Sequence, residues 1–83
     1  PVLLNKRFAK KDGAFITFGK KFKDDKTYFN LSKKGNLNEA ANNLYKIMRL
    51  IKNKKFKSVS VCKIPNFGIG CAIIDRLKKA SNK

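Results

Sequence analysis

The chain has 83 residues, enough for one small domain with a thin hydrophobic core, and 21 Lys and Arg against 5 Asp and Glu give it a net charge of +16. It has no histidine, and the spacing of Cys62 and Cys71 fits neither a zinc site nor a CxxC redox pair, so we expect two reduced thiols and no structural metal. No apolar run approaches the ~20 residues of a membrane span, so we expect a soluble, cytoplasmic protein.

The positive charge permits two interpretations. A strongly basic chain is typical of proteins that bind nucleic acid or anionic surfaces. However, Arg7, Arg49 and Arg76 are the only arginines, and no basic block exceeds two adjacent cations. Lysine, asparagine, isoleucine and phenylalanine are all residues of A/T-rich codons. The charge therefore indicates either a solvated surface shaped by genome composition or a site for a polyanion such as tRNA.

Three segments in the first half of the chain predict strands or loops. Residues 2–4 suit a short strand. The apolar segment "AFITFG", residues 14–19, predicts a buried strand, and the lysine-rich residues 20–26 predict a loop. Residues 27–32, "TYFNLS", predict a second strand that ends at the turn-like "KKG".

The next segment predicts an amphipathic helix. Asn36 followed three residues later by Glu39 is a capping-box pattern at a helix start. Apolar residues then recur with helical spacing, at Leu37, Ala40, Ala41, Leu44, Ile47, Met48 and Ile51.

The last third of the chain repeats this order of strand and helix. Residues 58–62, "SVSVC", predict a strand, and residues 70–80 predict a second amphipathic helix. Strand, helix and strand form a βαβ unit, whose strands should be parallel with a right-handed crossover. We therefore predict an α/β, Rossmann-like fold with a small, mainly parallel sheet of three or four strands and two main helices.

This topology predicts a candidate binding site. The loops "LSKKGN" and "IPNFGIG" both follow the carboxyl ends of strands, and open α/β folds place ligands at that edge of the sheet. We expect a docking or small-anion site there, formed by Ser32, Gly35, Asn36, Pro65, Asn66, Gly68, Gly70, Asp75 and Arg76. Asp75 also has the i, i+4 spacing of an ordinary surface ion pair with Lys79.

The Gly68-x-Gly70 loop has three interpretations. It does not match the dinucleotide fingerprint, because Ile73 stands at the third glycine position, and no Gly-Lys-Ser/Thr sequence of a phosphate-binding loop follows. The glycines can serve a tight turn. The helix start can also hold an anion through its backbone amides, or Pro65, Asn66 and Phe67 can contact a partner.

Catalytic groups are scarce. The only paired carboxylates are Asp24 and Asp25 in a lysine-rich loop, and no nucleophile stands beside a base. We therefore expect no catalytic residue in this chain and no cofactor bound by it.

Several motifs in order resemble a known family. "FITFG", "NLSKKGNLNEAANNLYKIMRLI" and "IPNFGIGCAIIDRLKKAS" resemble the accessory C-terminal domain of the two-domain L-threonylcarbamoyladenylate synthases, the long form of the YrdC-type family, over about residues 1 to 82. Asn36 stands where the family usually has Asp, Asn66-Phe67 replaces a commonly acidic pair, and Ile74 stands where Asn is frequent.

The resemblance implies the accessory domain of a larger enzyme. That enzyme makes threonylcarbamoyl-AMP and pyrophosphate from threonine, bicarbonate and ATP, for the threonylcarbamoyl modification of adenosine in tRNA. Its catalytic YrdC-like domain and the linker that covers the active site are absent from these 83 residues, so residues 1–83 would be a single docking or regulatory domain. A basic RNA-binding module and a small-ligand sensor at the second helix start are the alternatives.

Overall fold

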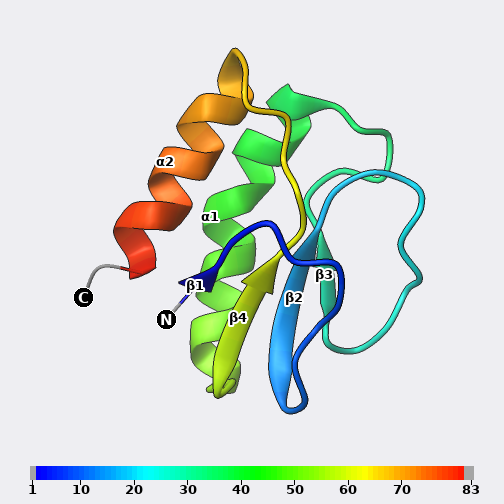
Figure 1. Cartoon of the computed structure of the whole chain (residues 1–83), viewed down its shortest axis with the longest axis vertical. Helices are drawn as coiled ribbons and strands as arrows, with labels where there is room; N and C mark the ends of the chain where they lie inside the picture. The colour runs from blue at the N-terminus through cyan, green and yellow to red at the C-terminus, as the bar shows by residue number, and fades with distance from the viewer. Residues whose placement is uncertain (1, 82–83) are drawn as a thin grey trace.

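The computed structural model describes residues 2–81 as a four-stranded sheet with two helices (Figure 1). The strands are β1 (Val2–Leu3), β2 (Gly13–Thr17), β3 (Tyr28–Asn30) and β4 (Ser58–Val61), and the helices are α1 (Leu37–Lys54) and α2 (Ile69–Ser81). The sheet order is β1-β4-β2-β3, and all neighbouring strands are parallel. The predicted α/β, Rossmann-like class with a small parallel sheet and two helices is confirmed.

The strand order adds a feature that the sequence did not indicate. β3 and β4, which α1 connects, are not neighbours, because β2 lies between them. In the register, Ile16 of β2 stands beside Phe29 of β3 on one side and Val61 of β4 on the other. Every residue of β2 is buried, as is usual for the central strand of a parallel sheet.

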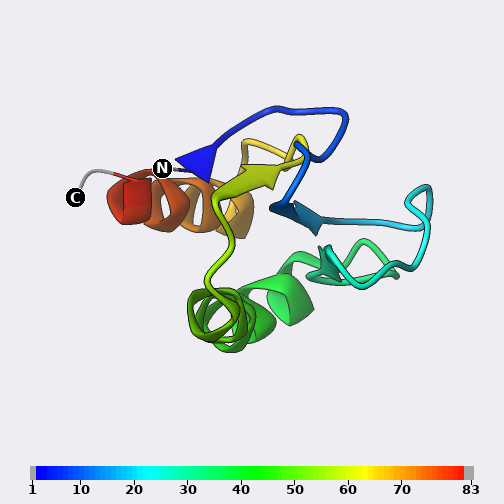
Figure 2. The same cartoon turned by 90° about the horizontal axis from the view of Figure 1, so that it is seen from below.

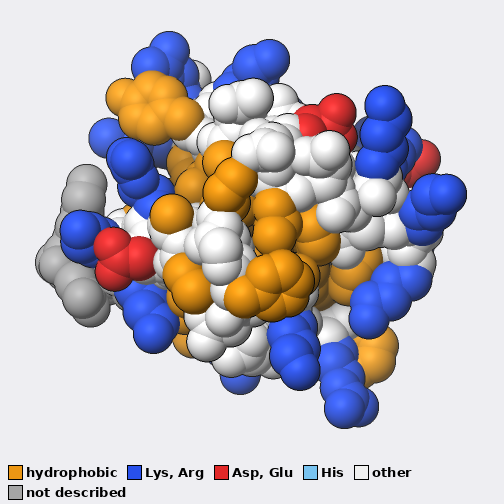
Figure 3. All heavy atoms as spheres, turned by 90° about the horizontal axis from the view of Figure 1, so that it is seen from above, with side chains coloured by type: hydrophobic (Ala, Val, Ile, Leu, Met, Phe, Trp, Pro, Cys, Tyr) orange, Lys and Arg blue, Asp and Glu red, His pale blue; other side chains and the backbone are white. Residues whose placement is uncertain are grey.

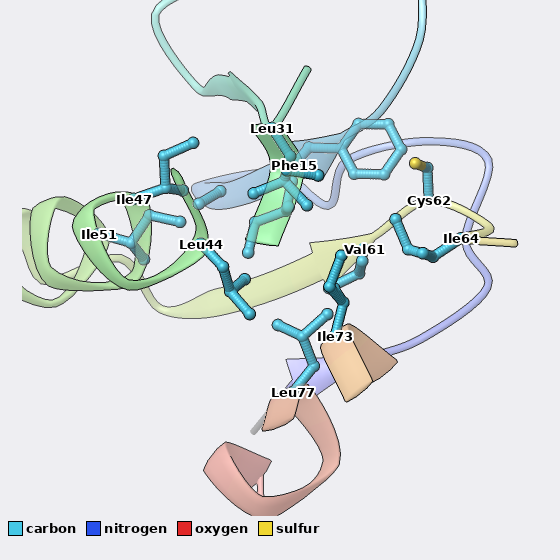
Figure 4. Close-up of a cluster of buried hydrophobic side chains, with 13 residues drawn as sticks. Phe15, Leu31, Leu44, Ile47, Ile51, Val61, Cys62, Ile64, Ile73 and Leu77 are labelled. Carbon is cyan, nitrogen blue, oxygen red and sulfur yellow. The ribbon is translucent and has the colours of Figure 1, made fainter. Parts of the chain in front are cut away.

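Both helices lie next to each other on one side of the sheet (Figure 2). Leu44, Ile47 and Ile51 of α1 and Ile73 and Leu77 of α2 are buried in the same apolar cluster as Val61 (Figure 4). Burying a side chain of this size stabilises the fold by roughly 1.5–3 kcal/mol. The amphipathic spacing of the two helices therefore creates one shared core.

The opposite face of the sheet has a smaller, aromatic core. Phe15 alternates with Ala14 and Ile16 along β2, so its side chain is on the other face. Its ring makes edge-to-face contacts with Tyr28 and Phe22, with centroids 5.2 and 5.6 Å apart. The predicted loop 20–26 is thus anchored to the sheet by Phe22.

Asn30 makes side-chain hydrogen bonds where β3 ends. The predicted strand 27–32 is longer than the observed Tyr28–Asn30. Asn30 donates from Nδ2 to the carbonyl oxygen of Gly19 at 2.9 Å and accepts from the backbone N–H of Ser32 at 2.9 Å. Asn30 thus supplies a side-chain partner for the N–H of Ser32, while the N–H of Leu31 still donates to the carbonyl oxygen of Thr17 at 2.8 Å.

Candidate functional site

The two loops of the predicted site lie at the same end of the molecule. Both follow the carboxyl ends of parallel strands, and each leads into the start of a helix (Figure 1). A Cβ built on Gly70 would be 3.6 Å from Cδ2 of Leu37, so the first turns of α1 and α2 adjoin. The fold therefore places residues 32–36 and 65–70 along one edge.

The loop before α1 is closed by a hydrogen-bond network. Ser32 donates from Oγ to Oε1 of Glu39 at 2.6 Å and accepts from the backbone N–H of Asn36 at 3.0 Å. Asn36 in turn accepts from the backbone N–H of Glu39 through Oδ1 at 3.0 Å. The predicted capping box is confirmed for the Asn36 side chain, which accepts from the N–H of Glu39. It is wrong for the Glu39 side chain, because the Ser32 hydroxyl lies between the Glu39 carboxylate and the N–H of Asn36 and bonds to both.

This network gives three predicted site residues a structural role. Ser32 is buried, and Asn36 is the N-cap of α1. Gly35 has a φ of +74°, a conformation that glycine adopts without strain, and its N–H donates to the carbonyl oxygen of Ser32 at 3.1 Å. These residues shape the start of α1, and hydrogen bonds within the loop occupy the Ser32 hydroxyl and the Asn36 side-chain oxygen.

The loop before α2 depends on close packing at Gly70. A Cβ on Gly70 would overlap the carbonyl oxygen of Pro65, so the backbone of the loop lies directly against the helix. Gly68 has a φ of +55°. The N–H groups of Gly70 and Cys71 donate to the carbonyl oxygens of Phe67 and Gly68 at 2.9 and 3.1 Å. These contacts support the tight-turn interpretation and leave those two amides already paired.

The same loop presents apolar side chains to solvent. Phe67 is 68% exposed and Ile69 is 38% exposed, while Asn66 accepts from Sγ of Cys71 at 3.3 Å. Figure 3 looks onto this end of the molecule and shows hydrophobic side chains gathered across its middle, with Lys and Arg side chains around them. An exposed apolar surface with a charged rim is typical of an interaction site.

Asp75 and Arg76 lie further along α2, away from the loop residues. Asp75 forms the expected surface ion pair with Lys79, with 3.3 Å between Nζ and Oδ2. Arg76 lines a hollow between the two helices together with Tyr45 and Met48 of α1. The predicted cluster is thus divided between the sheet edge and the helix surface.

The hollow between the helices is the feature that sequence reasoning missed. Its signal was present in α1, where Ala41, Tyr45 and Met48 widen the apolar stripe beyond the buried positions. A wide stripe on a helix indicates a second contact partner in addition to the sheet.

The cysteines are free thiols in different environments. Cys62 is buried, and this desolvation raises the pKa of its thiol to about 11, whereas Cys71 is exposed. A thiol with a raised pKa is protonated at neutral pH and is a weak nucleophile. Within residues 2–81, no three His, Cys, Asp or Glu side chains come together in a way that would hold a metal ion.

Neither described helix has the length and apolar composition needed to cross a bilayer. The fold and its exposed edge define a small, all-parallel α/β domain with two helices on one face and exposed apolar side chains where the strands end.

Comparison with protein families assigns the domain. Residues 3–82 match the model of the threonylcarbamoyl-AMP synthase C-terminal domain, and the chain belongs to this family. Searches of curated proteins and of solved structures found no match. The resemblance seen in the sequence motifs is therefore confirmed at the level of the family.

Proposed function

We propose that this chain is a non-catalytic docking and regulatory domain of a threonylcarbamoyl-AMP synthase. The parent enzyme would use threonine, bicarbonate and ATP to form threonylcarbamoyl-AMP and pyrophosphate in the cytoplasm, for the modification of tRNA. The chemistry would belong to a catalytic YrdC-like domain of the same protein. The domain described here would bind no cofactor of its own and would act through contact with that partner.

The exposed apolar surface at the sheet edge carries this proposal. Phe67 and Ile69 protrude from a loop that Gly70 and Pro65 hold tightly against the helix. A rigid loop loses little conformational entropy when it binds, so more of the gain from burying Phe67 remains as affinity. Covering a phenylalanine of this exposure contributes on the order of 1–2 kcal/mol. Asn66 and Gly68 belong to the same loop and complete the proposed contact.

The other residues of the predicted site support the contact from behind. Ser32, Gly35 and Asn36 fix the first turn of α1, whose Leu37 packs close to Gly70. A change in this network would alter the position of the loop rather than remove a contact atom. We therefore assign the contact to residues 65–69 and its positioning to residues 32–36 and Gly70.

Two exposed phenylalanines allow a matched test. Phe67 is 68% exposed in the proposed contact loop, and Phe8 is 78% exposed in the segment between β1 and β2. In the intact synthase, we expect Phe67→Ala to reduce threonylcarbamoyl-AMP formation several-fold. The variant Phe8→Ala removes the same side chain elsewhere and should retain the activity. Equal activity of both variants, with both folded, would refute docking through this loop.

The basic RNA-binding module is the weaker alternative. Its binding of tRNA would rest on lysine charge and would decrease steeply with salt. An RNA surface usually offers several aromatic rings on one face for base stacking. Phe15 is fully buried and Phe29 is half-buried, and the exposed rings of Phe8, Tyr45 and Phe67 come from three separate segments. Titration of the chain with tRNA at low and high salt tests this alternative. Tight tRNA binding at low salt that decreases steeply at high salt, together with full activity of Phe67→Ala, would favour it over docking.

A further inference from the structure

A cleft lies where the chain leaves the neighbouring strands β1 and β4. We call it the β1/β4 cleft. It has a volume of about 230 Å³, and it is lined by the residues that follow these two strands and by part of α2. Val61, Cys62 and Ile64 are buried at its apolar base.

The cleft forms because the two strands lead to opposite faces of the sheet. β4 continues into α2, which lies beside α1 on one face (Figure 2). The crossovers from β1 to β2 and from β3 to β4 run in opposite directions along the sheet, and right-handed crossovers of that kind lie on opposite faces. The connection after β1 therefore crosses the face without helices. Open α/β folds bind ligands in the crevice between strands whose connections part in this way.

Backbone contacts hold the side of the cleft that follows β1. Asn5 has a φ of +56°, so the chain bends there. The N–H of Lys6 then donates to the carbonyl oxygen of Val61 at 2.8 Å, which ties the connection onto the end of β4. The cleft is thus formed by the fold itself, as most small-ligand sites are.

The polar groups that line the cleft are cations and amides. They belong to Asn5, Lys63, Asn66 and Lys78, and none of the described residues that line it is Asp or Glu. The Lys63 ammonium and the Asn5 amide have no hydrogen-bond or ion-pair partner within residues 2–81, whereas Lys78 has another interaction. Asn66 accepts from Sγ of Cys71 through Oδ1, which leaves its Nδ2 donors for a ligand.

This lining selects a small anion. Ammonium and amide N–H groups donate hydrogen bonds, and a charged acceptor makes the strongest bonds with them. With lysines and no carboxylate at the cleft, a doubly negative phosphate gains more Coulomb energy than a singly negative carboxylate. The volume equals that of about eight water molecules at ~30 Å³ each. It therefore admits inorganic phosphate or a small phosphate ester.

We propose that the β1/β4 cleft binds a small phosphate-bearing anion through Lys63 and the amide groups of Asn5 and Asn66. This site goes beyond the proposed function, because it requires no catalytic partner domain. It also differs from the anion site predicted at the start of α2, where the N–H groups of Gly70 and Cys71 are already paired.

Titration of the 83-residue chain with inorganic phosphate, followed by backbone-amide NMR, tests the proposal. The ionic strength is kept constant with NaCl, because a chain with a net charge of +16 attracts any anion. We expect saturable shifts confined to residues 4–6, 62–66 and 74–78. Shifts that do not saturate, or that spread over lysines elsewhere in the chain, would overturn the proposal.

Two lysine variants make a matched pair. Lys63→Gln should weaken phosphate binding about tenfold, through the loss of one charge-assisted hydrogen bond. Lys46→Gln makes the same change in net charge on α1 and should bind phosphate as the wild type does. Both side chains are exposed, so both variants should keep the wild-type Tm. Equal phosphate affinities of the two variants would contradict the assignment to Lys63.

Acetate, titrated in the same way, distinguishes the class of anion. Its single negative charge should make its binding several-fold weaker than that of phosphate. Acetate that binds as tightly as phosphate would show that the phosphate assignment is wrong.

These outcomes are separable from those for the proposed function. If phosphate binding does not saturate but Phe67→Ala still reduces synthesis, docking stands and the anion site is wrong. If phosphate binds at the cleft but Phe67→Ala has no effect on synthesis, the anion site stands and the contact loop is wrong.

Discussion

Replacement of Gly70 by alanine should destabilise the domain through a single contact. A Cβ at this position would overlap the carbonyl oxygen of Pro65 and would be 3.0 Å from its carbonyl carbon. Both atoms are backbone, so the loop itself must move away from α2. Overpacking of this kind costs about 1–3 kcal/mol. Alanine returns up to about 1 kcal/mol through its higher helix propensity, which leaves a net loss of about 1–2 kcal/mol.

Thermal and urea unfolding of the 83-residue chain, followed by circular dichroism, measure this loss. For a domain of this size, each kcal/mol lowers Tm by about 4–8 °C, so we expect a decrease of roughly 5–15 °C. Gly68→Asn is the matched control, because nothing lies within 4 Å of its Cβ position and asparagine tolerates the φ of +55°. Some backbone strain remains at this φ, so we expect Gly68→Asn to cost less than about 1 kcal/mol and less than Gly70→Ala. A Gly70→Ala variant as stable as Gly68→Asn would show that the loop does not pack on α2 as described.

Substitutions at Asn36, Ser60 and Cys62 provide three further tests of the fold and its buried polar groups. Asn36→Ala removes the N-cap oxygen that accepts from the N–H of Glu39 and should cost about 1 kcal/mol in urea unfolding, whereas Asn38→Ala, exposed in the first turn, should be neutral or slightly stabilising. Ser60→Ala should not destabilise the domain, because the buried Ser60 hydroxyl has no hydrogen-bond partner among residues 2–81; a loss above about 1 kcal/mol would indicate a partner. Burial raises the pKa of the Cys62 thiol from 9.0 to about 11, so between these values the unfolded chain binds fewer protons and stability falls as pH rises. From pH 9 to 11, the wild type should lose about 2 kcal/mol more than Cys62→Ala; parallel pH profiles would contradict this.

The elements themselves could be predicted because their signals are local. The apolar run around Phe15 and the helical spacing of Leu44, Ile47 and Ile51 require only the neighbouring residues for their interpretation. The first half of the capping box is local too, since Asn36 and the N–H of Glu39 lie within one helical turn. These signals sufficed for the fold class and, through the order of motifs, for the family.

The interposition of Ser32 could not be predicted in this way. Its hydroxyl belongs to a residue seven positions before Glu39 and reaches the carboxylate at 2.6 Å because the chain turns between β3 and α1. The capping-box pattern describes only two residues, here Asn36 and Glu39. It therefore gives no indication that the hydroxyl of a third residue, Ser32, lies between them. The same holds for Gly70, where the sequence permitted a turn but did not show that Pro65 would press against the helix.

The sequence by itself determined which segments become strands and helices, that the strands are parallel, and that the two loops share an edge of the sheet. The tertiary structure decided that β2 lies between β3 and β4, that Arg76 lies on the helix surface rather than at that edge, and that small residues leave a groove between α1 and α2. The physical reason is the range of the forces involved. Periodicity and capping act within a few residues, whereas strand order and interhelical space depend on how separate elements fill one core.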